Sequence, residues 1–347
     1  MGNQKSNSKK CTFVFMILVT GGTGLVGANL LLECAKEKEK LRALYRRTEQ
    51  RDAVQSFFLQ TAPNQPDLFD AIEWIKADIT DLYALEKAFH GITQVYHCAA
   101  KVSFAAFHFS KLAKTNIEGT ANVVNFALKY NVKKLVYVSS IAAIGAEATK
   151  PWVTEDDSWD PNQDHTGYAH SKYGGELEVW RAGQEGLPVV IVNPGLIIGG
   201  FFWTRSSSSL FSMVKKGLRF YPTGNTAVVA IEDVVKCLRI LMQNKVSNER
   251  YILVSENLKT KTLLTQMALA LGTKPPYLPL KKGLLITVYW LEKIVGLFRF
   301  RKVFLSRAFI QTLGNSQSYS GDKAKSLLGN YTPLQSALEK IVKAYHF

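Results

Sequence analysis

Cysteine is scarce in this chain. Its 347 residues include only Cys11, Cys34, Cys98 and Cys237, and no two of these form a C-x-x-C pair. This spacing argues against a disulfide framework and against a zinc site of the common type. We therefore expect reduced thiols in a cytoplasmic protein, and no bound metal.

Long apolar runs are also missing. Lys5, Lys9 and Lys10 before the apolar residues 11–19 look like a signal peptide, but cleavage there would remove the first predicted strand. We expect instead a short lead into a buried strand. Elsewhere the longest apolar stretch, residues 284–291, is well below the roughly 20 residues that a membrane-spanning helix needs.

Acidic residues are few, and the net charge is +15. The excess of cations is concentrated in residues 1–10 and 280–307, and the second segment has apolar residues at spacings of three and four. This pattern predicts an amphipathic helix within 281–302. It would contact a membrane surface, cover the substrate site as a lid, or join subunits, for example in a homodimer. Because no pattern of a known nucleic-acid-binding motif accompanies the charge, we expect no nucleic acid.

A glycine-rich segment follows the first apolar stretch. The residues Val19-Thr20-Gly21-Gly22-Thr23-Gly24-Leu25-Val26-Gly27 stand directly before a helical pattern. Glycines at a strand-to-helix turn let the backbone approach a pyrophosphate, which the helix N-terminus then binds. The glycines fit both G-x-G-x-x-G and G-x-x-G-x-x-G, so they leave the subclass open. The residues predicted to bind a dinucleotide here are Gly21, Thr23, Gly24, Leu25, Val26 and Gly27.

Strand and helix patterns alternate through the first half of the chain, from residue 13 to residue 192. This alternation predicts βαβ units and an α/β fold with a doubly wound parallel sheet of the Rossmann type. The polar residues 48–70 predict an excursion between the second and third strands. We expect residues 1–200 to form the NAD(P)-binding domain, residues 225–255 to return to it, and residues 201–347 to supply mainly a small C-terminal substrate-binding lobe.

Tyr168 and Lys172 are four residues apart in a long helical pattern, which places them on one face of the helix. A nearby ammonium favours the phenolate and moves the phenol pKa toward the working range of an acid or base. Such a pair alone is usually a solvated helix face. Here Ser139 and Ser140 also stand at the end of an upstream strand, which favours a catalytic interpretation.

Seven segments together make the chain resemble the short-chain dehydrogenase/reductase superfamily. The resemblance is to its extended branch, which includes sugar-nucleotide epimerases, dihydroflavonol reductases and 3β-hydroxysteroid dehydrogenases. The segments are residues 20–27, 77–79, 97–100, 116–120, 138–140, 168–172 and 193–195.

The resemblance implies roles for single residues. Tyr168 would donate or accept the proton, Lys172 would hold the nicotinamide ribose and lower the tyrosine pKa, and Ser140 would fix the substrate oxygen. Asn116 would support the site, or would simply cap or kink its helix. The remaining cofactor contacts implied are Asp78 and Ile79 at the adenine, Ala99, Ala100 and Lys101 along the cofactor, and Pro194 and Ile197 beside the nicotinamide.

The end of the second strand bears on the type of cofactor. NAD-binding proteins place an acidic residue there to bind the ribose 2′-hydroxyl, whereas this chain has Arg46 and Arg47. Two guanidiniums can pair with a 2′-phosphate, so we expect NADP(H), with NAD(H) as the alternative.

Residues expected near the substrate limit which reactions the enzyme could catalyse. The sugar-nucleotide dehydratases carry Thr-Asp-Glu after the strand that ends here in Ser139-Ser140-Ile141-Ala142, so elimination is not expected. Bulky apolar residues favour a ring-bearing or lipid-like carbonyl over a nucleotide sugar, unless they belong to the core. These residues are Val102, Phe104, Phe107, Phe201, Phe202 and Trp203.

We therefore predict an NADP-dependent oxidoreductase that transfers hydride to or from a carbonyl or hydroxyl of a small substrate through a Ser/Tyr/Lys site. One alternative is an NAD-retaining nucleotide-sugar epimerase. Another, from a different class, is a non-catalytic cofactor-sensing protein, although a sensor is expected to lose the Ser/Tyr/Lys set that this chain keeps. Substrate identity, direction and oligomeric state stay open.

Overall fold

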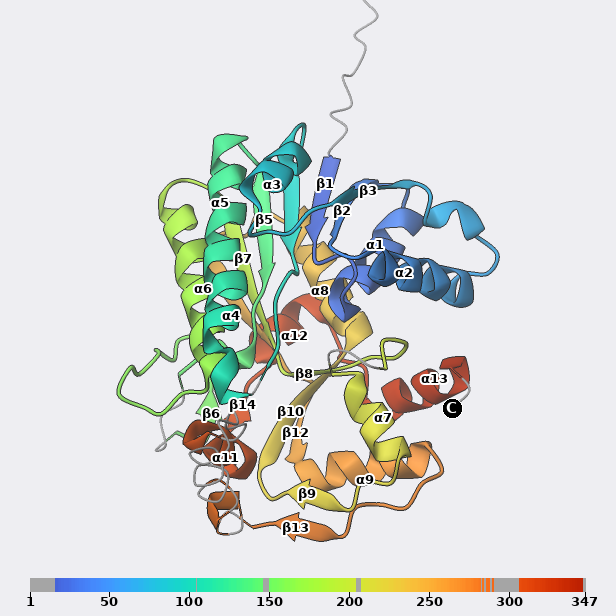
Figure 1. Cartoon of the computed structure of the whole chain (residues 1–347), viewed down its shortest axis with the longest axis vertical. Coiled ribbons are helices and arrows are strands. Elements are labelled where there is room, and N and C mark those ends of the chain that lie inside the picture. Colours follow the sequence, from blue (N-terminus) through green and yellow to red (C-terminus); the bar gives the residue numbers. More distant parts are fainter. Residues whose placement is uncertain are drawn as a thin grey trace, which may run out of the picture.

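A seven-stranded parallel sheet forms the centre of the computed structural model (Figure 1). The structure describes residues 16–345 apart from residues 104, 146–149, 204–206, 282, 284, 288 and 290–305. The strand order is β11-β7-β5-β4-β1-β2-β3. These strands are β1 (Met16–Thr20), β2 (Lys40–Tyr45), β3 (Ile72–Lys76), β4 (Gln94–His97), β5 (Lys134–Val138), β7 (Val189–Pro194) and β11 (Glu249–Leu253).

Helices cover both faces of this sheet, which is why β5 and β7 are buried along their whole length. One face packs on α1 (Leu25–Lys36), α2 (Thr48–Thr61), α8 (Ile231–Gln243) and α12 (Asp322–Leu328). The other packs on α3 (Leu82–Phe89), α5 (Gly119–Lys129) and α6 (Gly167–Gln184). The prediction of a doubly wound α/β fold is confirmed.

The segment between β2 and β3 is more regular than the sequence suggested. Residues 48–70, predicted as a polar excursion, contain the helix α2 and a short 3-10 turn, η1 (Pro66–Leu68). Val54, Phe57 and Phe58 recur at helical spacing and are fully buried against the sheet, so a narrow apolar stripe stabilises a largely polar helix.

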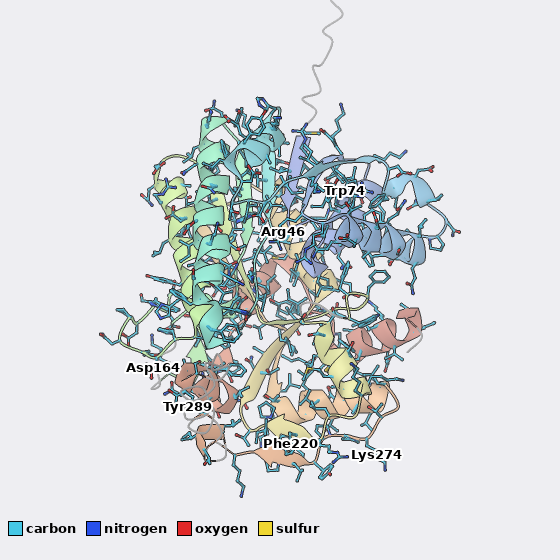
Figure 2. The ribbon with its side chains drawn as sticks, viewed as in Figure 1. Arg46, Trp74, Asp164, Phe220, Lys274 and Tyr289 are labelled. Carbon is cyan, nitrogen blue, oxygen red and sulfur yellow. The ribbon has the colours of Figure 1, made fainter. Side chains whose placement is uncertain are left out.

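A smaller lobe packs below the carboxyl ends of the strands (Figure 1). Its three-stranded sheet has the order β12-β10-β8, formed by Glu256–Lys259, Asn225–Ala230 and Leu196–Ile198. Its helices are α7 (Ser209–Lys215), α9 (Thr260–Ala270) and α13 (Leu334–Tyr345), which share one apolar core. A strand pair, β9 (Phe220–Pro222) and β13 (Leu278–Leu280), closes the far end, and Figure 2 shows Phe220 and Lys274 there, away from Arg46.

Shorter elements connect these parts. They are η2 (Ala106–His108), α4 (Phe109–Ala113), the π-helical turn η3 (Lys114–Glu118), η4 (Ile141–Ala143), α11 (Arg307–Gly314), and the strand pair β6 (Trp152–Val153) and β14 (Ser318–Tyr319). Most of 281–302, the segment predicted as an amphipathic helix, lies outside the described residues. Within the described part of the chain, each helix is too short or too polar to cross a bilayer.

Candidate active site

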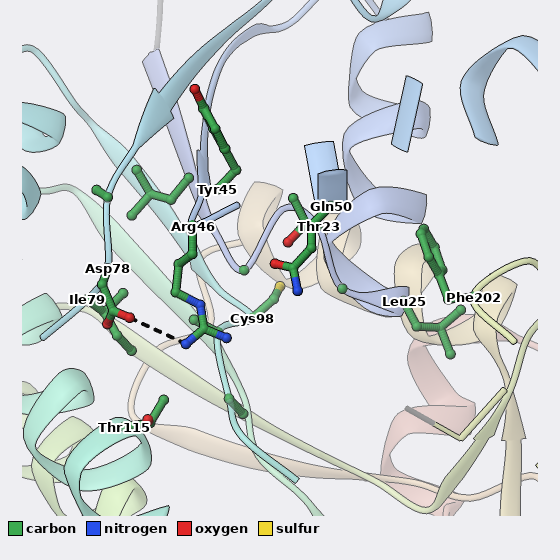
Figure 3. Close-up of a pocket in the computed structure, with 16 residues that line it drawn as sticks. Thr23, Leu25, Tyr45, Arg46, Gln50, Asp78, Ile79, Cys98, Thr115 and Phe202 are labelled. Carbon is green, nitrogen blue, oxygen red and sulfur yellow. Dashed lines mark hydrogen bonds and ion pairs between the residues drawn. The ribbon is translucent and has the colours of Figure 1, made fainter. Parts of the chain in front are cut away.

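The strand order reverses between β1 and β4. The loops that follow these two strands meet there, with Gly21 against Ala99. In open α/β sheets such a reversal leaves a crevice at the carboxyl ends of the strands. A cavity opens at this point, beside the start of α1 (Figure 3).

Three glycines shape the turn from β1 to α1. Gly21 has φ +68°, and a Cβ there would lie 2.6 Å from the Cα of Ala99. A Cβ on Gly27 would lie 2.3 Å from the carbonyl oxygen of Gly21. Because Gly21, rather than Gly22, has the left-handed conformation and the close approach, the geometry follows the G-x-x-G-x-x-G pattern.

Gly24 precedes the first turn of α1 and lines the cavity. A Cβ on it would meet only the carbonyl oxygen of Gly21, at 3.3 Å, and would otherwise occupy open space. The absent side chain leaves room for a phosphate group at the amide groups of the helix N-terminus. The turn therefore fits a dinucleotide.

Nine of the residues predicted to bind the cofactor line this cavity. They are Gly21, Thr23, Gly24, Leu25, Arg46, Asp78, Ile79, Ala99 and Ala100. Seven further residues line it that the sequence did not indicate as cofactor contacts, namely Leu44, Tyr45, Gln50, Ala77, Cys98, Thr115 and Phe202. Tyr45 and Gln50 could have been found because they are close to Arg46 in the chain. Phe202 lies far along the chain, in the connection between β8 and α7, so no local signal indicates it.

Arg46 and Asp78 pair with each other in the lining of the cavity (Figure 3). A guanidinium nitrogen of Arg46 lies 3.3 Å from a carboxylate oxygen of Asp78, whose other oxygen accepts hydrogen bonds from the backbone and hydroxyl of Thr80. Burial acts to raise the pKa of Asp78, but these hydrogen bonds and the guanidinium outweigh it and hold the pKa below its usual value. Arg47 is exposed just before α2 and does not line the cavity.

The other predicted cofactor residues lie outside the lining of this cavity. Gly27 contacts the glycine turn, Val26 and Ile197 pack against the sheet core, and Pro194 ends β7. Lys101 is held through its backbone, whose N–H donates to Asn116 Oδ1 and whose carbonyl accepts from Asn116 Nδ2.

Asn116 lies in the π-helical turn η3 and is 1% exposed. Besides holding Lys101, its Nδ2 donates to the hydroxyl of Ser171 at 2.9 Å. π-helical turns recur at functional sites because they re-aim a side chain within a helix. Asn116 thus fixes the loop after β4 against α6, so it is more than a helix cap.

Helix α6 carries Tyr168 and Lys172. The hydroxyl of Thr166 caps the helix by accepting from the amide of Ala169, which fixes the turn that presents Tyr168. Burial raises the pKa of Tyr168, and hydrogen bonding from Ser140 opposes this shift. Ser140 is therefore within hydrogen-bonding reach of the phenol.

Lys172 is buried against strand β5. It is 1% exposed, and its Nζ donates to the hydroxyl of Tyr137 and to the carbonyl of Val138, both at 2.9 Å. Burial lowers the pKa of Lys172 to about 7, while the Glu176 carboxylate acts to raise it. The expected lowering of the Tyr168 pKa by Lys172 is wrong for this structure, because the ammonium faces Tyr137 and desolvation dominates at the phenol.

A buried polar cluster supports these residues from below. Glu176, 0% exposed, accepts from Asn193 Nδ2 at 2.5 Å and pairs with Arg250 of β11. The same Asn193 nitrogen donates to the backbone carbonyl of Ser140 at 2.9 Å. The cluster thus connects Ser140 to α6. Glu176 stands four residues after Lys172 on the same helix face, and this spacing could have indicated its place near the site.

A second buried cluster links the glycine turn to Asn116. His97 lies between the hydroxyls of Thr20 and Thr120, at 2.6 and 3.0 Å, and stacks on Tyr137. The Thr120 hydroxyl donates to the carbonyl of Asn116. Burial lowers the pKa of His97 to about 3, so this imidazole is neutral and serves as a fixed connector.

The aromatic residues expected on the substrate side divide between several places. Phe201 and Phe202 pack on Phe57 of α2, with ring centroids 5.3 and 5.7 Å away, and Trp203 packs on Phe211 in the lobe core. Phe201 and Phe202 thus join the connection after β8 to α2, and Phe202 also lines the cofactor cavity, whereas Trp203 belongs to the lobe core. Val102 and Phe107 are exposed, and Phe104 lies outside the described residues.

Comparison with known proteins agrees with this architecture. Residues 17–253 match the model of the NAD dependent epimerase/dehydratase family. Sterol demethylase protein B of Methylococcus capsulatus is 27% identical, with 77% of this chain and 78% of that protein aligned. Dihydroflavonol 4-reductase of Dianthus caryophyllus is 23% identical, with 68% of each chain aligned.

A solved structure extends the comparison to nearly the whole chain. The crystal structure of gox2253 is 26% identical, superposes with a TM-score of 0.78, and covers 95% of this chain and 98% of its own. The cavity, the glycine turn and the helix that carries Tyr168 all lie within the region matched by the family model. The chain therefore belongs to the NAD-dependent epimerase/dehydratase family, and it is an NAD(P)-dependent enzyme of the extended short-chain dehydrogenase/reductase type.

Proposed function

We propose that this enzyme is an NADPH-dependent reductase of a small ring-bearing or lipid-like carbonyl compound. The observation that carries the proposal is the pairing of Ser140, just after the end of β5, with the phenol of Tyr168 on α6. A phenol that keeps its proton at neutral pH is suited to donate it to a carbonyl oxygen. The names of two relatives, dihydroflavonol 4-reductase and sterol demethylase protein B, support the substrate class.

The chain's own residues divide the chemistry as follows. When bound, the reduced nicotinamide supplies the hydride that the carbonyl carbon receives. The Ser140 hydroxyl holds the carbonyl oxygen, and the Tyr168 hydroxyl transfers its proton to that oxygen, which leaves an alcohol and a phenolate. In its protonated form Lys172 has three N–H donors, of which Tyr137 and Val138 accept two, so the third can donate to the nicotinamide ribose.

Tyr168→Phe tests the proton transfer, because it removes the hydroxyl and keeps the ring. Reduction of a panel of aryl and sterol ketones by NADPH should fall by about a hundredfold or more, the usual contribution of a positioned acid. NADPH binding, followed by its fluorescence, should stay within a few-fold of wild type. Reduction at the wild-type rate would refute the assignment of Tyr168.

Arg46 carries the choice of cofactor in this proposal. It lines the cavity at the end of β2, where a 2′-phosphate would exchange its pairing with Asp78 for a stronger, bidentate partner. Calorimetry should show tighter binding of NADPH than of NADH, and Arg46→Asp should weaken NADPH alone. Equal binding of both cofactors to wild type would contradict the proposal.

The second candidate is an NAD-retaining epimerase, which the same Ser140, Tyr168 and Lys172 could serve. It differs in one observable: an epimerase keeps its dinucleotide through the catalytic cycle. Mass spectrometry of the purified protein would reveal retained NAD in that case. Protein that purifies free of dinucleotide and consumes NADPH in stoichiometric amounts supports the reductase.

A further inference from the structure

The far end of the small lobe has an unusual charge distribution. Residues 207–231 and 257–281, which build α7, β9, β10, α9 and β13, contain no Asp or Glu. The same residues carry seven cations, Lys215, Lys216, Arg219, Lys259, Lys261, Lys274 and Lys281. Within the described part of the chain, no side-chain hydrogen bond or ion pair engages Arg219, Lys274 or Lys281. Arg219, Lys274 and Lys281 are exposed, and neither β9 nor β13, the strands beside them, contains a carboxylate that could compensate them.

Large apolar side chains are exposed among these cations. Phe220 is 43% exposed, Tyr277 65% and Leu278 38%. A single exposed hydrophobic residue needs no explanation, but a group of them next to one another marks an interaction site.

The backbone places these residues side by side. In the parallel pair β13–β9, Leu278 is the register partner of Phe220. The amides of Tyr277 and Leu278 both donate to the carbonyl of Arg219. Lys274 lies three residues before Tyr277, and Lys281 lies three residues after Leu278. Figure 2 shows Phe220 and Lys274 at the same end of the lobe. We call Arg219, Phe220, Lys274, Tyr277, Leu278 and Lys281 the basic apolar face.

We propose that the basic apolar face docks this enzyme on the surface of an anionic lipid bilayer. Phe220 and Leu278 would enter the boundary between headgroups and acyl chains, and Tyr277 would lie at headgroup level with its hydroxyl in water. Arg219, Lys274 and Lys281 would contact the lipid phosphates around them. This binding is independent of the reaction that the enzyme catalyses.

A bilayer fits this face better than the other anionic macromolecules. A nucleic acid would pair with the cations but would leave Phe220 and Leu278 without an apolar environment, since base stacking favours aromatic platforms and not an aliphatic side chain. A lipid surface offers negative charge and hydrocarbon together. The face also lies at the end of the lobe opposite the sheet, so docking would leave the cofactor cavity open to solvent (Figure 1).

Sedimentation with lipid vesicles tests the proposal on the full-length protein. Vesicles of phosphatidylcholine and phosphatidylglycerol in equal parts should bind the wild type at low salt, and vesicles of phosphatidylcholine alone should bind it far less. Added salt should weaken the binding, because exposed charges are screened. The triple variant Arg219→Glu, Lys274→Glu, Lys281→Glu should bind about a hundredfold more weakly or worse, since each basic residue near an anionic surface contributes roughly fivefold.

A matched control carries the same change of charge at the opposite end of the molecule. Lys40, Lys133 and Lys245 are exposed at or before the starts of β2, β5 and β11, so replacing all three by Glu changes the net charge equally and spares the face. This control should keep most of the vesicle binding. The pair Phe220→Ser and Leu278→Ser should lose about tenfold in binding, because it removes apolar area that would enter the bilayer.

Three results would each overturn the proposal. The first is no binding of the wild type to the anionic vesicles at low salt. The second is equal loss of binding in the Arg219, Lys274 and Lys281 triple variant and in its control, which would assign the binding to net charge alone. The third is binding to a polyuridine RNA with the same dependence on these residues and none to vesicles, which would assign the face to nucleic acid.

Discussion

Arg250→Met should destabilise the protein strongly, and the cost should depend on pH. Arg250 pairs with Glu176, whose side chain is 0% exposed, while the arginine side chain is 15% exposed. Methionine fills a similar volume and removes the charge. The carboxylate of Glu176 then keeps Asn193 as a neutral donor but loses its directly bonded cation.

The size of the effect follows from the burial. Removing one partner of a buried ion pair costs about 3–5 kcal/mol, because the remaining charge is left in a medium of low polarity. Arg250 is slightly exposed, and the nearby ammonium of Lys172 also acts to lower the Glu176 pKa. The expected cost of Arg250→Met is therefore near the lower end of this range, about 3 kcal/mol.

The sign of the pH dependence follows from the Glu176 pKa. Burial raises this pKa above the ordinary value of 4.5, and Arg250 acts to lower it, so the variant has a higher pKa than the wild type. At a pH between the pKa of Glu176 in the unfolded chain and its higher pKa in the folded chain, Glu176 is protonated only in the folded chain. The free energy of unfolding therefore falls as pH rises through that interval. The cost of Arg250→Met should therefore be smallest near pH 4.5, where the ordinary glutamate pKa lies, and should grow toward neutral pH.

Equilibrium urea unfolding at a series of pH values measures this cost. The double variant Glu176→Gln, Arg250→Met replaces both charges and should recover much of the stability at neutral pH, with the extra pH dependence gone. A pH-independent cost for Arg250→Met, or a double variant as unstable at neutral pH as the single one, would refute the assignment of a buried carboxylate to Glu176.

Three further changes give independent checks. Gly27→Ala would place a Cβ 2.3 Å from the carbonyl of Gly21, so we expect loss of NADPH binding in fluorescence titration and about 1–3 kcal/mol less stability in urea. Thr166→Ala removes the cap of α6 and should lower stability by about 1 kcal/mol, whereas Thr166→Ser should keep it. Between pH values of about 7 and 10.5 the amine of Lys172 is protonated in the unfolded chain but not in the folded chain, so the stability of the wild type should rise with pH. Lys172→Met should abolish this rise. Urea unfolding of both proteins across this pH range would show the difference.

The sequence alone was sufficient for most strands and helices in the first half of the chain and for the first turn of the cofactor site. Alternating apolar strands and amphipathic helices depend on local periodicity, which is why the parallel sheet was predicted correctly. The glycines at 21, 24 and 27 are also a local signal, since the chain must turn and approach a ligand within a few residues. Helix α2 was not predicted, because its apolar stripe is narrow and its other residues are polar. Helices α8 and α12, which return to the sheet from the second half of the chain, were not predicted as elements either.

The chemistry around the site depended on tertiary structure. The neighbours of Lys172 are Tyr137 and Val138 on β5, more than thirty residues away, and the partner of Glu176 is Arg250 on the edge strand. Helical spacing placed Tyr168 and Lys172 on one face, but it could not say which of them faces the core. Burial of that face determines the pKa of both groups, and burial is set by how α6 packs across β5 and β7, which no local pattern of residues contains.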